Sequence, residues 1–142
     1  LLEQAEGTAG AAMTPEVRTA ALGEPLERVR ERVAAEPPPR EGLLTVVPVD
    51  AERRPHGVIS VASLLSGSGE PVPVPAVRAD TPIETVLELF AAYDVLAVPV
   101  VDGDGRLIGA VAVDDVLDVL LADRLPGARR FRLLAARRRA PR

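Results

Sequence analysis

The sequence predicts a mixed α/β (α+β) fold made of two βαββα copies, and three observations indicate it. An aspartate with a glycine seven residues later occurs twice, as Asp50 with Gly57 and as Asp102 with Gly109, and the second pair lies 52 residues after the first. Upstream of each pair, apolar residues recur at helical spacing. The composition is 47% hydrophobic but only 2% aromatic. Because such aliphatic residues suit small sheets faced by helices, we expect two mixed sheets packed as a pseudo-two-fold pair.

Each copy is expected to begin with a strand followed by an amphipathic helix. Its buried face is Leu26, Val29 and Val33 in the first copy, and Ile83, Val86, Leu87 and Phe90 in the second. The first copy carries five extra residues after its helix, supplied by Glu36–Gly42, whose prolines cannot continue the helix. In the second copy we expect Pro82 in the first helical turn, with Thr81 or Asp80 as the cap and with Glu84 and Glu88 facing solvent.

A hairpin and a final helix complete each copy. In the second copy, AVPVV (97–101) and RLIGAVAV (106–113) flank Asp-Gly-Asp-Gly, which predicts a tight turn because glycine tolerates positive φ angles. The final helix is expected to open at Val113 or Asp114 and to run to about Leu121. The predicted organisation is a remnant of an upstream helical domain (1–14), repeat 1 (15–66), a linker (67–75), repeat 2 (76–123) and an arginine-rich tail (124–142).

The charge distribution separates the body from the tail. All seventeen basic residues are arginines, and eight of them lie from Arg124 onward without any acid. We expect the tail to be disordered or an amphipathic helix that could dock on an anionic surface, but the acidic body argues against nucleic acid as a partner. The chain has no cysteine, which excludes disulfides and thiolate metal sites. Its single histidine, His56, lies beside a turn without a nucleophile nearby, so no catalytic residue is predicted and an enzyme is not expected.

With these motifs, the chain resembles a tandem CBS (Bateman) module. The stretch YDVLAVPVVDGDGRLIGAVAVDDVLDVL is similar, more narrowly, to the CBS region of MgtE-type magnesium transporters, and Glu6–Thr14 resembles the junction with that family's helical N-terminal domain. The resemblance implies a homodimer, a cytoplasmic location and, in a whole transporter, a transmembrane pore. It ends at Asp123, where the chain becomes arginine-rich instead of acidic.

A divalent cation is the first ligand class that the sequence suggests. Asp114, Asp115 and Asp118 crowd one side of the last helix, and bound Mg²⁺ would relieve their repulsion. Acids in a first helical turn also complement the helix dipole without any ion, so the spacing alone leaves both interpretations open. The resemblance to MgtE-type transporters implies magnesium ligands at the Ala91 carbonyl, Asp94, Asp115 and Asp118.

An adenine nucleotide, ATP or AMP, is the second class. The nucleotide motif of CBS modules is a glycine, a Thr or Ser three residues on and an Asp six residues on, which bind phosphate and ribose. After Gly57 stand Ser60 and Ser63, and after Gly109 stand Ala112 and Asp115, so each copy keeps only one polar anchor. We therefore expect a regulatory module that senses Mg²⁺ and gates magnesium transport or a partner domain. The alternatives are an adenine-nucleotide sensor, with Ser60, Ser63 and Asp115 as its residues, and a scaffold that docks through its basic tail.

Overall fold

The computed structural model describes residues 7–36 and 44–124, and these residues form two three-stranded sheets with five helices. Strand order is β1-β2-β3 in one sheet and β4-β5-β6 in the other, and each sheet joins a parallel to an antiparallel pair. In chain order the elements are α1 (Ala9–Ala12), β1 (Arg18–Ala21), α2 (Leu26–Ala35), β2 (Thr45–Val49), β3 (Ile59–Ser60), α3 (Val61–Ser66), β4 (Val77–Arg78), α4 (Ile83–Tyr93), β5 (Ala97–Val101), β6 (Leu107–Ala112) and α5 (Val113–Arg124). The predicted fold class is confirmed.

The strand registers follow the internal repeat. Thr45 pairs with Ser60 in the first sheet, and Ala97 pairs with Ala112 in the second. Both partners therefore shift by the same offset as the aspartates of the two turns. The parallel pairs repeat as well, since Ala21 lies opposite Val49 and Arg78 lies opposite Val101.

Helix α4 buries the face that its spacing predicts. Ile83, Val86 and Phe90 are buried, whereas Glu84 and Glu88 are exposed. The prediction for its start was wrong, because Pro82 occupies the N-cap position instead of the first turn and no side chain caps the helix. The Thr81 hydroxyl instead accepts a hydrogen bond from the backbone N–H of Arg78 at 3.0 Å, so it closes the turn that precedes the helix.

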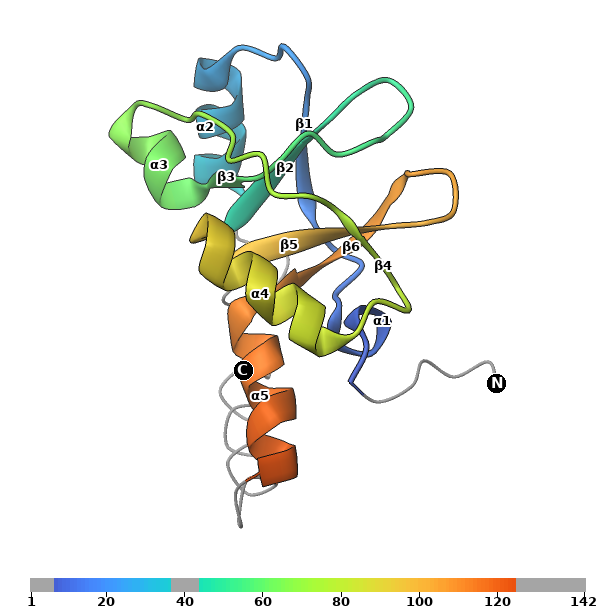
Figure 1. Cartoon of the computed structure of the whole chain (residues 1–142). Helices are drawn as coiled ribbons and strands as arrows, with labels where there is room; N and C mark the ends of the chain where they lie inside the picture. Colours follow the sequence, from blue (N-terminus) through green and yellow to red (C-terminus); the bar gives the residue numbers. More distant parts are fainter. Residues whose placement is uncertain (1–6, 37–43, 125–142) are drawn as a thin grey trace.

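One large core joins the two repeats. Val47 and Val58 of the first repeat pack in the same cluster as Val98, Val100 and Val111 of the second. A smaller cluster lies between the first sheet and the helices α2 and α3, and its buried members are Ala20, Val29, Val46, Ile59 and Leu64. Figure 1 shows α2 and α3 together at the first sheet, with α4 and α5 on the side of the second sheet. The repeats thus form a single folding unit, as their small size predicts.

The segments that precede the two repeats are exchanged between them. Thr14, which precedes β1, forms an antiparallel bridge with Ala110 of repeat 2, and Val72, which precedes β4, forms the equivalent bridge with Val58 of repeat 1. Helix α1, which precedes repeat 1, also contacts repeat 2, because the N–H of Ala9 donates to the carbonyl of Thr81 at 2.8 Å. Residues 7–14 and the predicted linker are therefore packed parts of the fold.

The last helix is longer than the sequence predicts. It includes residues 122–124, beyond the predicted end at about Leu121, because no proline or glycine interrupts it there, and Arg124 is also the last residue that the structure describes. Among the described residues, no helix is both long enough and apolar enough to cross a lipid bilayer. The predicted arginine-rich tail, apart from Arg124, and most of Glu36–Gly42 lie outside the described residues.

Candidate functional site

A cavity of about 90 Å³ lies at the junction of the two repeats. Its polar lining comes from both copies and from the connection between them. The lining residues are Thr45, Val58, Ser60, Ser63, Glu70, Val72, Asp94, Val95 and Leu96. The cavity therefore brings together two residues predicted for nucleotide binding, Ser60 and Ser63, and one predicted for magnesium, Asp94.

The serines are held by the first turn of α3. Ser60 is the N-cap residue, and its hydroxyl accepts a hydrogen bond from the backbone N–H of Ser63 at 3.0 Å. The Ser63 hydroxyl lies 2.9 Å from the Ser68 hydroxyl. Ser60 thus caps a helix, a structural role that its spacing from Gly57 does not reveal. The Ser63 hydroxyl does not cap the helix, so it can exchange its contact with Ser68 for a ligand more easily.

At one glycine of each repeat, the backbone lies very close to the segment that crosses from the other side of the repeat pair. A Cβ placed on Gly57 would meet the Val72 carbonyl oxygen at 2.4 Å, and one on Gly109 would meet the Thr14 carbonyl oxygen at 2.6 Å. Gly57 also has a φ of +84°, which L-residues rarely adopt. The two glycines are therefore required by the exchanged segments, whether or not a ligand is present.

Asp94 ends helix α4 in the left-handed conformation. Its φ and ψ are 54° and 48°, and its backbone N–H donates to the carbonyl of Phe90 at 3.0 Å. Aspartate tolerates this conformation better than most residues. Two residues later, the Leu96 carbonyl accepts a hydrogen bond of 3.0 Å from the N–H of Val113, the first residue of α5. The end of α4 and the start of α5 therefore meet at the same end of the second sheet.

The predicted magnesium residues differ in exposure. Ala91 and Asp94 are exposed, Asp118 is half-buried, and Asp115 is buried with 7% of its surface exposed. Asp115 and Asp118 do not line the cavity that contains Asp94. Within residues 7–36 and 44–124, no group of three or more His, Cys, Asp or Glu side chains is close enough to hold a metal ion. The magnesium set is not gathered by this part of the chain alone, and these residues remain a prediction.

The predicted nucleotide residues are divided in the same way. Ser60 and Ser63 line the cavity, whereas Asp115 belongs to α5 in the second repeat. Sequence reasoning missed two polar lining residues, Thr45 and Glu70. Thr45 stands where the second repeat has Ala97, so comparing the two copies position by position would have drawn attention to it. Glu70 lies in the predicted linker, and no local pattern signals its contact with the cavity.

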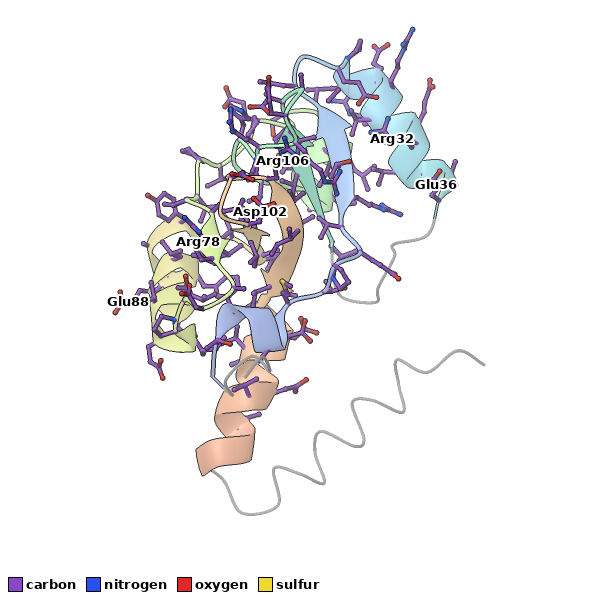
Figure 2. The ribbon with its side chains drawn as sticks, turned by 90° about the vertical axis from the view of Figure 1, so that its right-hand side faces the viewer. Arg32, Glu36, Arg78, Glu88, Asp102 and Arg106 are labelled. Atoms are coloured by element: carbon purple, nitrogen blue, oxygen red, sulfur yellow. The ribbon has the colours of Figure 1, made fainter. Side chains whose placement is uncertain are left out.

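The turns of both hairpins are held by an aspartate. Asp50 Oδ1 accepts hydrogen bonds from the N–H groups of Glu52 and Arg54, both at 2.9 Å, and Asp102 Oδ1 accepts from those of Asp104 and Arg106 at 2.8 and 3.0 Å. Figure 2 shows Asp102 and Arg106 together at the second turn. The bond to the N–H of Arg106 is the main cause that lowers the pKa of the Asp102 carboxyl.

His56 belongs to the first turn and not to the cavity. Its Nε2 lies 2.9 Å from Asp50 Oδ2, and this hydrogen bond is the main cause that lowers the pKa of Asp50. Both side chains are partly exposed. The structure therefore gives His56 a role in the hairpin, in agreement with its assignment to a surface turn.

A second hollow, of about 210 Å³, lies on the outer side of repeat 1. It is lined by Arg18, Thr19, Arg32, Val33 and Glu36, and Figure 2 shows Arg32 and Glu36 along α2. The guanidinium of Arg32 is paired with Glu24, which lowers the pKa of that carboxyl, and Arg18 donates to the backbone carbonyl of Glu36. Because internal partners already engage both arginines, this hollow is a weaker ligand site than the cavity between the repeats.

The fold and this cavity define a paired α/β module in which two similar units enclose a small polar space. The CBS domain family model matches residues 71–122 of the chain, which span the second repeat. The magnesium transporter MgtE of Thermus thermophilus is 38% identical over 125 residues, which are 83% of this chain and 28% of that protein.

Solved structures agree with the sequence match. The crystal structure of the cytosolic domain of the Mg²⁺ channel MgtE in complex with ATP is 38% identical, with a TM-score of 0.70 over 82% of this chain and 50% of that chain. A CBS domain-containing protein from Thermotoga maritima shares the fold at 21% identity, with a TM-score of 0.67 over 85% of this chain and 99% of that chain. The chain is thus a CBS module, regulatory in kind, that resembles the cytosolic region of MgtE. It spans about 28% of the MgtE transporter.

Proposed function

We propose that this chain is the ligand-sensing part of an MgtE-like protein, and that it senses Mg²⁺ to gate magnesium transport or a partner domain. The observation that carries the proposal is the hydrogen bond between the N–H of Val113 and the carbonyl of Leu96, because it joins the helix ends that carry the acidic residues. The 38% identity to a magnesium transporter supports it. In such a protein this module would lie in the cytoplasm, between an upstream helical domain and a transmembrane pore.

Magnesium would be held at the end of α4 and the first turns of α5. The carbonyls of the last four residues of a helix have no partner within it, and that of Ala91 is among them. Asp94 follows three residues later, and Asp115 and Asp118 lie in the first two turns of α5. Mg²⁺ usually keeps several waters and binds one or two carboxylates directly. A site of this kind would be completed by acids of another domain or of a second copy.

A homodimer is part of this proposal. Leu65 in α3 and Leu117 in α5 occupy equivalent positions in the two repeats and are 62% and 50% exposed. Exposed leucines at repeated positions favour a contact with a second copy of the chain. Light scattering should give twice the monomer mass for the wild type, and a monomer for the double variant Leu65→Glu/Leu117→Glu.

The magnesium proposal is tested by thermal unfolding in a magnesium titration. A ligand at ten times its Kd stabilises the folded state by about 1.4 kcal/mol, which raises the Tm of a chain of this size by about 4 °C. We expect this rise at millimolar Mg²⁺, and its loss in the double variant Asp94→Ala/Asp118→Ala. Glu88→Gln, an exposed acid on α4, is the control and should keep the rise. A melting curve that stays unchanged up to tens of millimolar Mg²⁺ would contradict the proposal.

An adenine nucleotide is the second candidate ligand. The specific observation in its favour is the cavity that gathers Ser60 and Ser63, and a relative with 38% identity forms a complex with ATP. Calorimetry in magnesium-free buffer should detect binding of adenine compounds that Ser63→Ala weakens and Asp118→Ala leaves unchanged. If Asp115→Asn instead abolishes the heat and Ser63→Ala does not, the ligand binds at the second repeat and not in this cavity.

A further inference from the structure

The charge of the cavity between the repeats restricts what can enter it. Among the residues that the structure describes, its lining contains two carboxylates, Glu70 and Asp94, three hydroxyls and four apolar residues, but no arginine, lysine or histidine. Arg30, which reaches α3 from α2, donates to the carbonyls of Leu64 and Gly67 at 2.6 and 3.0 Å. Its donors are therefore directed at the end of α3, and the described lining residues offer no cation to a phosphate group.

The backbone adds to the negative potential. Asp94 stands at the C-terminal end of α4, an eleven-residue helix, where the helix dipole presents partial negative charge. Glu70 adds a second carboxylate from the connection between the repeats. A phosphate that entered the cavity would meet like charge from Glu70 and from Asp94, and none of the described lining residues carries a guanidinium or an ammonium group to compensate for it.

The hydroxyls suit a sugar. Thr45 is only 2% exposed and lines the cavity. A hydroxyl both donates and accepts, and a carboxylate accepts the two hydroxyls of a ribose diol, as acidic residues do in dinucleotide-binding folds. Thr45, Ser63 and Asp94 thus supply partners for a group rich in hydroxyls.

Size and apolar walls fit the same ligand. A buried water needs about 10–15 Å³, so a volume of about 90 Å³ accepts a group the size of several waters, such as a ribose. Val58, Val72, Val95 and Leu96 provide apolar contacts for a base, and Leu96 is 47% exposed at the rim. From these features we infer that the cavity binds an uncharged ribonucleoside and discriminates against the same ligand once it carries phosphate. This inference rests on the second candidate function, adenine-nucleotide sensing at this cavity.

Calorimetry on the full chain in buffer with EDTA tests the inference, with adenosine, AMP and ATP as probes. Adenosine should bind at least about tenfold more tightly than AMP or ATP, a difference of about 1.4 kcal/mol. The double variant Glu70→Gln/Asp94→Asn should reduce the difference to about threefold or less, because the two carboxylates cause it. Glu88→Gln, an exposed acid of α4 outside the lining, should leave the difference unchanged.

The outcomes separate the inference from the function on which it rests. Binding of AMP or ATP as tight as that of adenosine would overturn the inference and leave nucleotide sensing standing. Absence of binding by all three compounds would overturn both. An unchanged preference for adenosine in the double variant would also contradict the inference, since the carboxylates would then not be its cause. Asparagine tolerates the left-handed conformation of position 94, so the variant is expected to fold.

Discussion

The two repeats have the same backbone arrangement but differ in the side chains that line the cavity in repeat 1 and occupy the equivalent positions in repeat 2. Asp50 and Asp102 accept the same pair of backbone N–H groups, two and four residues further on. At the cavity, however, Thr45, Ser60 and Ser63 of repeat 1 correspond to Ala97, Ala112 and Asp115 of repeat 2. Both copies therefore keep the same turns and strand registers, whereas the hydroxyl side chains at these three positions occur only in repeat 1.

The turns show the same contrast at one backbone position. Gly105 has a φ of +82°, and Arg53 at the equivalent position of repeat 1 has a φ of 64°. Arg53 offsets its unfavourable conformation through the other repeat, because its Nε donates to the Leu107 carbonyl at 3.2 Å and its own carbonyl accepts from the Leu107 N–H at 2.9 Å. A strained residue is tolerated where it joins the two copies.

The largest effect is expected from closing the space at Gly57. Gly57→Ala should lower the free energy of unfolding by about 3 kcal/mol, because the new Cβ meets the Val72 carbonyl oxygen at 2.4 Å and the residue keeps a positive φ. Urea denaturation measures it. Gly103→Ala is the control, since its Cβ would meet only Arg78 Nη1 at 3.6 Å, and its change should stay within about 0.5 kcal/mol. A loss at Gly57 no greater than that of the control would refute the close approach.

A medium effect is expected at the paired turn positions. Gly105→Ala should destabilise the chain by about 1 kcal/mol through its left-handed backbone. Arg53→Gly relieves a similar strain but loses the bond to Leu107 and gains freedom in the unfolded state, so we expect a net change within about 0.5 kcal/mol. Denaturation of both variants under the same conditions measures the contrast. Equal losses in the two variants would show that the turns do not differ in strain.

The smallest effect on the free energy of unfolding is expected from lowering the pH. The folded state lowers the pKa of Asp50, mainly through His56, and of Asp102, mainly through the N–H of Arg106. The stability that each contributes is complete above the unfolded carboxyl pKa of about 4, and it is lost as the pH falls through the lowered pKa of the folded state. Asp102→Asn should therefore make stability less dependent on pH below about 4, as measured by urea denaturation at a series of pH values. Asp104→Asn, whose backbone and not its side chain joins the turn, is the control and should retain the wild-type dependence.

The sequence was sufficient to predict the fold because its signals are local or repeated. The Asp–Gly offset and the helical spacing around Val29 and Val86 predicted the order of elements, which the structure confirms. Much of the cavity could not be predicted, because Glu70 and Asp94 are brought to Ser63 by tertiary packing between copies. The caps were misassigned at Pro82, since a proline suits either side of a helix start. The magnesium and nucleotide residues remain predictions for binding experiments.

The exchange of the segments at Thr14 and Val72 means that neither half of the fold is complete without the other. Each half gives a short arm to the other, so separating the halves would remove a bonded neighbour from Val58, which precedes β3, and from Ala110 in β6. Either half alone would therefore lack backbone hydrogen-bond partners that only the other half provides, such as the Val72 carbonyl for the Val58 N–H and the Thr14 carbonyl for the Ala110 N–H.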